Sequence, residues 1–330
     1  MLPFISIIIP CRNEEKYIGK CLESITLQDY PKEKMEVFVI NGASEDKTGK
    51  IIQDYARKYP YIKILENPKR YTPFGLNIGL KEAKGEVIAR MDSHAGYEKD
   101  YVSKCVKHLL ESGADNVGGV IKTLPARDTI SAKAVALVLS HPFGAAGSYF
   151  RIGSKEPKYV DTVFGGCYKR DVFDKIGFFN EKLLRSQDIE FNQRLKNAGG
   201  KIFLAPEIKA IYYPQPDFSR FLKHNFFDGV WTIYPLKFGV KIFSWRHLIP
   251  LLFVLTLLIC GILGVFLPLF SNLFFLILKI YFLASVIFSL QIAFKEKNIK
   301  LFFFLPIAFA SRHFGYGLGS LYALIKIYKK

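Results

Sequence analysis

Cysteine is scarce in this sequence and follows no recognisable pattern. The 330 residues include five scattered cysteines, namely Cys11, Cys21, Cys105, Cys167 and Cys260. None forms a Cys-x-x-Cys pair, which excludes a zinc knuckle and the disulfide framework of a small secreted domain. The first residues also lack the basic leader and cleavage site of a signal peptide. We therefore expect a first strand there and a reduced, cytoplasmic catalytic half.

Acidic residues are scarce in the last third of the chain. Residues 218–330 hold 13 basic and 2 acidic residues, whereas residues 1–217 hold 33 basic and 27 acidic residues. The whole chain has a net charge of +17 and is 50% hydrophobic, which excludes a disordered protein. Basic residues among long apolar runs suit an anionic membrane surface better than nucleic acid. Membrane lipids, and no nucleic acid, are the expected partners.

Charge is absent from Leu248 to Leu269, and the stretch from Leu273 to Phe294 contains only Lys279. Each stretch has 22 residues, enough for a hydrocarbon core that requires about 20. The intervening residues 270–272 predict a tight hairpin. The sequence therefore predicts two transmembrane helices, at 248–269 and 273–294.

A third apolar stretch, residues 301–325, is predicted as a third membrane segment that can span, re-enter or lie flat. It contains Arg312 and three glycines. A charged side chain at membrane depth must face protein, water or an anionic head group. Before the spans, residues 218–247 place aromatic residues beside basic ones at helical spacing. This pattern predicts interfacial helices, with a surface helix packed on the first domain as the alternative.

Residues 1–217 alternate between strand-like and helix-like patterns. The apolar runs Ile5–Ile9, Val37–Ile40, Ile62–Leu65 and Val87–Met91 are typical of strands, with helical periodicity between them. Repeated β-α-β units predict an α/β fold with a Rossmann-like, mostly parallel sheet. Such sheets bind ligands at the carboxyl ends of their strands, which directs attention to the loops after Ile9, Ile40 and Met91.

Polar side chains follow the first two strands. Pro10, Arg12 and Glu14 suit contact with a base or ribose, although the same residues suit an ordinary helix start. Asn41 ends the second strand, where its amide oxygen can accept a hydrogen bond from a base. Asp46, a few residues later, suits a helix cap.

Asp92 and His94 follow the fourth strand, and residues two apart at a strand end point to the same side. That arrangement suits two ligands of one divalent cation, Mn²⁺ or Mg²⁺, with a plain loop as the alternative. Later in the chain, Asp188 begins a helical run. It suits either a first-turn acid or a general base that deprotonates an acceptor hydroxyl.

The order and spacing of these segments resemble family 2 glycosyltransferases of the GT-A fold, and most closely the branch with succinoglycan-biosynthesis enzymes. The resemblance covers about residues 3–217 and rests on six segments, residues 9–14, 41–48, 77–79, 90–95, 164–170 and 176–191. It implies transfer of a sugar from a nucleotide diphosphate donor with inversion at the anomeric carbon.

The resemblance also implies roles for individual residues. It implies nucleotide-sugar contacts at Pro10, Arg12, Glu14, Asn41, Asp46, Arg90 and Asp92, a donor and acceptor loop at Gly165, Gly166 and Gln187, metal ligands at Asp92 and His94, and a catalytic base at Asp188. Asn41 stands where most members have Asp, and His94 where most have the second Asp of Asp-x-Asp. The Gln-x-x-Arg-Trp motif of processive polymerases is missing, which favours addition of a single sugar.

The leading hypothesis is an integral membrane, inverting glycosyltransferase with a cytoplasmic catalytic domain at 1–217, interfacial helices at 218–247 and a transmembrane region at 248–330. Its acceptor would be a hydroxyl of a lipid-linked, polyprenyl-type glycan. One alternative is a polyprenyl-phosphate glycosyltransferase. Another is an inert nucleotide-sugar-binding membrane protein or a transport component.

Overall fold

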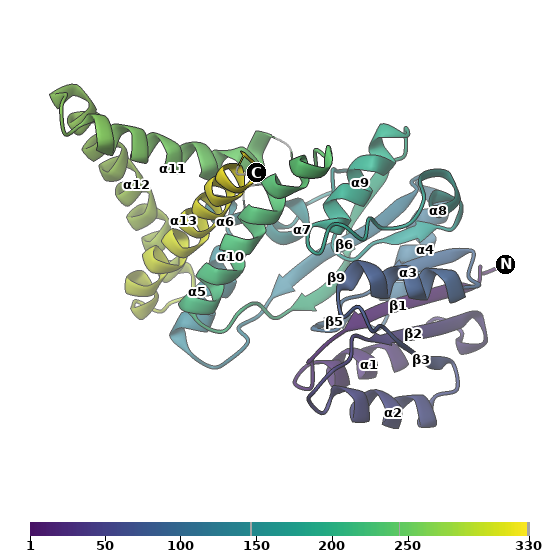
Figure 1. The fold of residues 1–330 in the computed structure, drawn as a ribbon. Coiled ribbons are helices and arrows are strands. Elements are labelled where there is room, and N and C mark those ends of the chain that lie inside the picture. The colour runs from purple at the N-terminus through teal and green to yellow at the C-terminus, as the bar shows by residue number, and fades with distance from the viewer. Residues whose placement is uncertain (146, 244, 329–330) are drawn as a thin grey trace. The chain divides into compact units, whose positions relative to one another are not determined.

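The computed structural model describes residues 1–145, 147–243 and 245–328 (Figure 1). The chain divides into two compact units. Unit 1 comprises Met1–Lys122 and Tyr149–Tyr212, and unit 2 comprises Thr123–Ser148 and Tyr213–Lys330. Residues 329–330, the end of the predicted membrane region, lie outside the described residues.

Unit 1 begins with the predicted alternation of strands and helices. Its elements are β1 (Ile5–Cys11), α1 (Ile18–Thr26), the short 3₁₀ helix η1 (Lys32–Lys34), β2 (Met35–Asn41), α2 (Thr48–Lys58), β3 (Ile62–Glu66), α3 (Thr72–Glu82) and β4 (Val87–Arg90). Strand β1 pairs in parallel with β2 and β4, and β2 pairs in parallel with β3. The α/β fold is confirmed, and all four strands end at the same edge of the sheet.

The second half of unit 1 makes the sheet mixed rather than mostly parallel. It contains β5 (Ala95–Tyr97), α4 (Tyr101–Glu111), β6 (Asn116–Thr123), α7 (Tyr149–Ile152), β7 (Lys158–Tyr159), β8 (Cys167–Lys169), α8 (Asp171–Ile176), α9 (Gln187–Asn197) and β9 (Ile202–Tyr212). The sheet order is β3-β2-β1-β4-β8-β6-β9-β5, with β7 beside β9. The pairs β4–β8, β6–β8, β5–β9 and β7–β9 are antiparallel.

The core of unit 1 lies on both faces of the sheet because successive strand side chains point to opposite sides. In β1, Ile7 and Ile9 join the cluster that includes Leu22 of α1, whereas Ile8 joins the cluster that includes Leu76 of α3. Each buried side chain of this size stabilises the fold by roughly 1.5–3 kcal/mol. The two covered faces leave the strand ends as the open edge.

A buried carboxylate at the opposite end of the sheet gives a stability prediction. Glu36 of β2 is 3% exposed. It accepts hydrogen bonds from Ser6 Oγ (2.7 Å), Lys84 N–H (2.7 Å) and Lys63 Nζ (3.0 Å). Burial opposes the charged form, but these bonds and the charge of Lys63 outweigh it and lower the pKa of Glu36.

We expect Glu36→Gln to lower the free energy of unfolding by about 1.5–3 kcal/mol at neutral pH, because charge-assisted bonds are lost. A lowered folded-state pKa stabilises the fold above the unfolded-state pKa, and that contribution disappears as pH falls through the folded-state pKa. Thermal unfolding at several pH values measures the difference in stability between the unchanged chain and the variant, and this difference should become smaller in acid. Glu33→Gln, at an exposed position of η1, is the matched control. Equal stability of the two variants at neutral pH would contradict the assignment.

Unit 2 is helical in its described residues. It contains α5 (Ile130–Leu139), α6 (Pro142–Ala145), α10 (Phe218–Ile233), the 3₁₀ helix η2 (Tyr234–Phe238), α11 (Trp245–Leu263), α12 (Pro268–Lys295) and α13 (Lys300–Tyr328). Helix α13 contacts α5, α10, α11 and α12. The segment Thr123–Ser148 therefore packs with helices that lie much further along the chain.

Glycines allow α10 and α13 to approach closely. A Cβ atom on Gly229 of α10 would lie 2.0 Å from the Tyr316 carbonyl oxygen, and one on Gly319 of α13 would lie 1.9 Å from the Phe226 carbonyl oxygen. Small residues at helix contacts let backbones pack together, as is common in membrane proteins. The glycines of the third apolar stretch therefore support helix packing.

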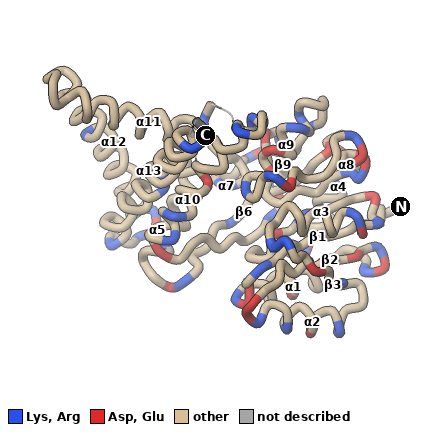
Figure 2. The backbone as a smooth tube through the Cα atoms, viewed as in Figure 1, with Lys and Arg blue, Asp and Glu red and all other residues tan. Residues whose placement is uncertain are grey.

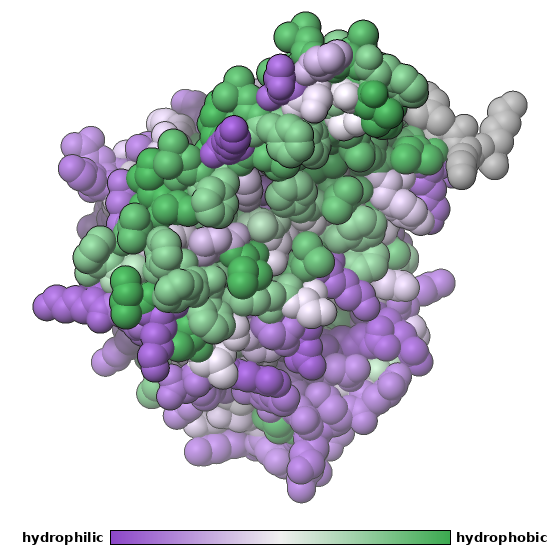
Figure 3. All heavy atoms as spheres, turned by 90° about the vertical axis from the view of Figure 1, so that its left-hand side faces the viewer, coloured by the Kyte–Doolittle hydropathy of each residue, from purple (hydrophilic) through white to green (hydrophobic). Residues whose placement is uncertain are grey.

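Helices α11 and α12 are long and apolar enough to cross a membrane, by length and composition. The tube along these two helices is almost entirely tan in Figure 2, so few of their residues are charged, and apolar residues gather over the helices of this unit in Figure 3. Exposed examples are Leu252, Ile259, Ile262, Phe275 and Phe282. The turn between the two helices lies at residues 264–267, so the hairpin predicted at 270–272 is wrong. Helix α12 begins earlier because Pro268 suits a first helical turn.

Candidate active site

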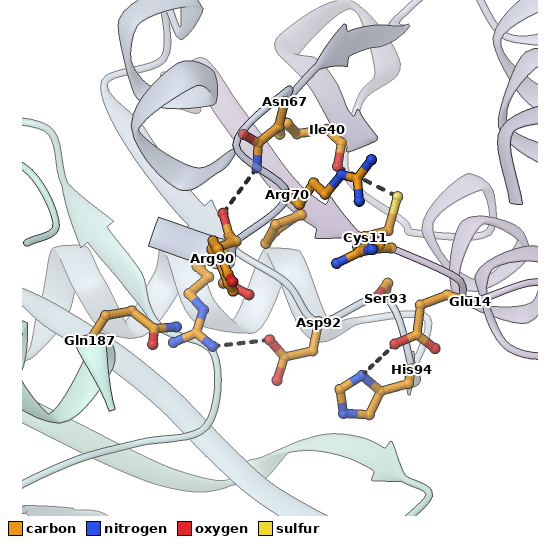
Figure 4. A pocket seen from close by; sticks show the side chains of 14 residues that line it. Cys11, Glu14, Ile40, Asn67, Arg70, Arg90, Asp92, Ser93, His94 and Gln187 are labelled. Carbon is orange, nitrogen blue, oxygen red and sulfur yellow. Dashed lines mark hydrogen bonds and ion pairs between the residues drawn. The ribbon is translucent and has the colours of Figure 1, made fainter. Parts of the chain in front are cut away.

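A cavity of about 250 Å³ opens in unit 1, where the side chains and loops at the carboxyl ends of β1, β3 and β4 meet. Seven residues proposed from the sequence line it, namely Pro10, Arg12, Glu14, Arg90, Asp92, His94 and Gln187. Figure 4 shows Arg90 between Gln187 and Asp92, with His94 and Glu14 beyond Asp92. Parallel strands thus bring segments far apart in the chain to one site.

Arg90 connects two carboxylates at this cavity. Its Nη2 donates to Asp92 Oδ1 at 3.1 Å, and its Nη1 lies 3.4 Å from Asp188 Oδ2. Burial opposes the charged guanidinium, but Asp92 and Asp188 outweigh it and raise the pKa of Arg90. Asp188 itself stands at the start of α9, beside the cavity residue Gln187, and its side chain is 36% exposed. The arginine therefore holds an accessible carboxylate next to the cavity.

Asp92 and His94 lie on the same side of the cavity (Figure 4). His94 Nδ1 lies 3.5 Å from Glu14 Oε1. Burial disfavours protonated His94, whereas the Glu14 contact and the charge of Asp92 favour it, and together they raise the pKa of His94. A metal ion at His94 would therefore compete with a proton.

The described residues contain no cluster of three His, Cys, Asp or Glu side chains arranged for a metal ion. Asp92 and His94 supply one carboxylate and one imidazole. Ions such as Mg²⁺ are often held by one or two protein ligands together with substrate phosphates, so this pair fits a metal that arrives with a diphosphate.

Asn41 and Asp46 do not line the cavity. The Asn41 amide group donates to the Glu66 carboxylate at 3.2 Å, and its Oδ1 accepts from the Ser44 N–H at 3.1 Å. Asp46 accepts from the N–H groups of Thr48 (2.9 Å) and Glu15 (3.2 Å). Both side chains therefore stabilise the loop between β2 and α2, and Asp46 also connects it to the loop between β1 and α1.

The loop between β2 and α2, with the first residue of α2, holds the loop between β1 and α1 in place. Thr48 Oγ1 accepts from the Glu14 N–H at 2.7 Å, and Ser44 Oγ accepts from the Asn13 N–H at 3.1 Å. The Asn13 side chain accepts in turn from the Glu45 N–H at 2.9 Å. These bonds position the backbone that carries Arg12 and Glu14.

Gly165 and Gly166 act through the backbone of Arg90. The Arg90 N–H donates to the Gly166 carbonyl at 2.9 Å. Gly165 has φ +69°, and a Cβ there would lie 2.7 Å from the Arg90 carbonyl oxygen. The predicted loop glycines therefore permit the close approach that orients Arg90, and they do not line the cavity.

The other residues that line the cavity were not predicted as site residues, and a group of them, Asn67, Arg70, Tyr71 and Thr72, comes from one loop. They follow β3, whose carboxyl end lies at the same edge as those of β1, β2 and β4 because all four strands are parallel. The sequence feature that could have identified these residues is their position in the loop after the third predicted strand. Arg70 Nη1 lies 3.7 Å from Glu45 Oε1, and Arg12 Nη2 lies 3.8 Å from the same oxygen, so two arginines share one carboxylate.

A cysteine also lines the cavity. Burial, followed by the charges of Glu14, Glu66 and Asp46, raises the pKa of Cys11 to about 12. The thiol is therefore protonated at neutral pH and is a poor nucleophile.

The mixed sheet, the cavity at its parallel strand ends and the acidic groups beside it define the class of GT-A glycosyltransferases. The solved structure of the mannosyltransferase PcManGT from Pyrobaculum calidifontis in complex with GDP-Man and Mn²⁺ has this fold. It aligns with a TM-score of 0.62 and 18% identity over 94% of this chain and 87% of that one. At this identity the likeness shows the fold alone.

Sequence comparison identifies the family. The profile of Glycosyl transferase family 2 matches residues 6–177. The dolichyl N-acetyl-alpha-D-glucosaminyl phosphate 3-beta-D-2,3-diacetamido-2,3-dideoxy-beta-D-glucuronosyltransferase of Methanococcus voltae is 31% identical over 98% of both chains. The succinoglycan biosynthesis protein ExoA of Rhizobium meliloti is 27% identical over 74% of this chain and 80% of that protein. The chain belongs to glycosyltransferase family 2 and is a glycosyltransferase.

Proposed function

We propose that this glycosyltransferase is anchored in a membrane and transfers a sugar, with inversion, from a nucleotide diphosphate donor to a hydroxyl of a lipid-linked glycan. The observation that carries the proposal is the Arg90 bridge, which holds Asp92 and Asp188 beside one cavity. Asp92 would hold a cation that binds the donor diphosphate, and Asp188 would accept the proton of the acceptor hydroxyl. Because Arg90 contacts both carboxylates, the sugar donor and the sugar acceptor would meet at one site, as a single displacement requires.

The donor side of the proposal uses the cavity lining. Pro10, Arg12 and Glu14 would contact the nucleoside, and Arg70 would add a second guanidinium close to Arg12. Arginine donors suit phosphate oxygens because their planar fork makes two parallel hydrogen bonds. Asn41 and Asp46 would act indirectly, by holding the loop that carries Arg12. The GDP-Man complex of the structural neighbour supports a nucleotide-sugar donor.

Asp92 and His94 would hold a divalent cation, Mn²⁺ or Mg²⁺. A cation held there would neutralise negative charge on the nucleoside diphosphate leaving group. Arg90 keeps the Asp92 carboxylate aimed at the cavity through its 3.1 Å bond. The Mn²⁺ in the complex of the structural neighbour supports a cation of this type.

Asp188 would accept the proton of the acceptor hydroxyl as that oxygen attacks the anomeric carbon. General-base catalysis of this kind contributes about 10²- to 10⁴-fold. Its exposed side chain admits an acceptor from outside the cavity. In-line attack opposite the leaving diphosphate would invert the anomeric configuration.

The membrane part of the proposal rests on α11 and α12. If unit 1 is cytoplasmic, these two helices return the chain to the cytoplasm at Lys295, Lys297 and Lys300, as the positive-inside tendency prefers. We propose α13 as a third membrane segment. The name of the Methanococcus voltae relative describes a lipid phosphate that already carries a sugar, which supports a sugar hydroxyl as the acceptor in preference to the lipid phosphate itself.

The test is incubation of the full chain in membranes with labelled UDP-, GDP- and dTDP-sugars, with and without Mn²⁺, followed by extraction of lipid. We expect label in the lipid fraction, dependent on the metal and joined through a glycosidic bond. A sugar joined to lipid through a phosphodiester would contradict the hydroxyl acceptor. Full activity in a chelator would contradict the metal, and no transfer or hydrolysis with any donor would contradict the enzyme.

The unpredicted Arg70 gives a prediction for donor binding. We expect Arg70→Gln to weaken nucleoside diphosphate binding about tenfold, because a charge-assisted bond to phosphate is lost. Titration calorimetry measures the change in Kd. Arg57→Gln removes the same charge from an exposed position of α2 and should leave the Kd unchanged. An equal Kd for both variants would exclude Arg70 from the donor site.

A further inference from the structure

A second cavity, of about 70 Å³, lies entirely within unit 2. Its lining includes Arg246, His247, Arg312, His313 and Tyr316. The volume holds several water molecules and so accommodates a small polar group. A polar cavity beside apolar helices calls for an explanation from its side chains.

Arg246 has an unused donor. Its Nε is buried and has no hydrogen-bond partner among the described residues. Its Nη1 lies 3.5 Å from the Gly147 carbonyl, a weak contact at most. A buried guanidinium N–H without an acceptor is unfavourable, and an anion that entered the cavity would supply one.

Arg312 is held in a fixed position. Its Nε donates to the Gly144 carbonyl at 3.2 Å, and its Nη1 donates to Asn225 Oδ1. Its guanidinium also lies 5.6 Å from the Tyr316 ring centre. Asp228 Oδ2, at 3.8 Å from Nη1, neutralises part of this charge. The two guanidinium charges at the cavity therefore exceed the single negative charge of Asp228.

His313 has a structural role and carries no charge in this arrangement. Its Nε2 lies 2.8 Å from the Phe143 carbonyl, which can only accept, so Nε2 carries the proton. Its Nδ1 lies 3.0 Å from the Tyr281 hydroxyl and can accept from it. A neutral imidazole satisfies both contacts. His313 therefore adds no charge to the cavity, whereas Arg246 and Arg312 each bring a guanidinium to it.

The surroundings of the cavity point to a lipid phosphate. Arg246 lies in the first turn of α11, where the helix dipole favours an anion. The same helix continues with exposed Ile249 and Leu252, which offer an apolar path for a hydrocarbon chain. A soluble phosphate would use the arginines but not the apolar path. A phosphate attached to a long isoprenoid chain would use both.

We propose that the Arg246–Arg312 cavity binds the phosphate of the polyprenyl carrier to which the acceptor glycan is attached. This inference rests on the proposed lipid-linked acceptor and names where its carrier is held. The arginines would grip the phosphate, which takes no part in the reaction, while the sugar hydroxyl remains the reacting group. The carrier phosphate then acts as a binding handle common to acceptors with different glycans.

The test measures binding without a sugar donor. The full chain, in phosphatidylcholine nanodiscs, is titrated with a fluorescent short-chain polyprenyl phosphate. The competitors are the unlabelled polyprenyl phosphate, the matching polyprenol, inorganic phosphate and phosphatidylglycerol. We expect Arg246→Gln to raise the Kd for polyprenyl phosphate about tenfold or more. Arg220→Gln removes the same charge from an exposed position of α10 and should not change it.

Equal Kd values for the Arg246 and Arg220 variants would overturn the proposal, as would competition by polyprenol as strong as that by the unlabelled polyprenyl phosphate. Full displacement by inorganic phosphate would assign the cavity to a soluble anion, and displacement by phosphatidylglycerol would assign it to bulk lipid. Either result would overturn the proposal that the cavity binds a polyprenyl carrier. If Arg246→Gln does not fold, the wild-type competition series still decides. Tight, arginine-dependent binding in a chain without transfer activity would refute the proposed function and leave this site standing.

Discussion

Asp188→Asn is expected to reduce sugar transfer about 10²- to 10⁴-fold, because it removes the proposed general base. The asparagine side chain keeps nearly the same shape, and its oxygen can still accept from Arg90. We therefore expect the Kd for the nucleotide donor to change less than about threefold. Steady-state transfer and donor binding, measured on the same preparation, separate the chemical step from the binding step.

Two further variants serve as controls for the Asp188→Asn experiment. Asp174→Asn, at an exposed position of α8, removes a carboxylate from the same unit and should leave transfer unchanged. Asp188→Glu restores the carboxylate at a shifted position and should recover part of the rate. Transfer by Asp188→Asn at the rate of the Asp174 control would reject Asp188 as the base. A large loss of donor affinity would instead indicate that Asp188 acts by orienting Arg90.

Asp92→Asn is expected to lower transfer about a hundredfold or more and to weaken the dependence of donor binding on Mn²⁺. The substitution removes a charged ligand of the proposed cation, and such a cation provides several kcal/mol of stabilisation to the developing charge. It also breaks the 3.1 Å ion pair with Arg90, so the guanidinium would keep its contact with Asp188 and lose the one with Asp92. A titration of donor binding against Mn²⁺ concentration measures the effect.

The Asp92 result is compared with Asp54→Asn, which removes an exposed carboxylate from α2. The control should show the Mn²⁺ dependence of the unchanged chain. Identical Mn²⁺ titrations for the two variants would remove Asp92 from the proposed cation site. A loss of transfer with an intact Mn²⁺ dependence would assign Asp92 to orientation of Arg90.

Local patterns were sufficient for the first half of unit 1. The continuous apolar run Ile5–Ile9 predicts a strand that is buried on both faces, because successive side chains of a strand point to opposite sides. In the structure, Ile7 and Ile8 of β1 indeed pack in different hydrophobic clusters. Helical spacing likewise predicts α1, α2 and α3, whose apolar stripes cover the sheet. The parallel order then follows from repeated β-α-β units, and with it the edge where the cavity lies.

The same patterns were insufficient for side-chain partners within the site. Asn41 and Asp46 stand in a loop near the cavity, yet their oxygens and nitrogens bind loop backbone and Glu66. A polar residue at a strand end can point to ligand or to a neighbouring loop, and sequence spacing is the same in both cases. The loop after β3 shows the converse, because Arg70 enters the cavity without belonging to any recognised motif.

By itself, the sequence determined the α/β class, the strand edge that carries the cavity, the two long apolar helices and the family, because each depends on periodicity or on the order of short motifs. Only the tertiary structure decided that Arg90 joins Asp92 to Asp188, that Thr123–Ser148 packs with the C-terminal helices, and that Arg312 meets Gly144 and Asn225. The contact between Arg312 and Gly144, for example, joins residues 168 positions apart in the chain. These contacts depend on complementary shape and charge across the folded molecule, which no local pattern encodes.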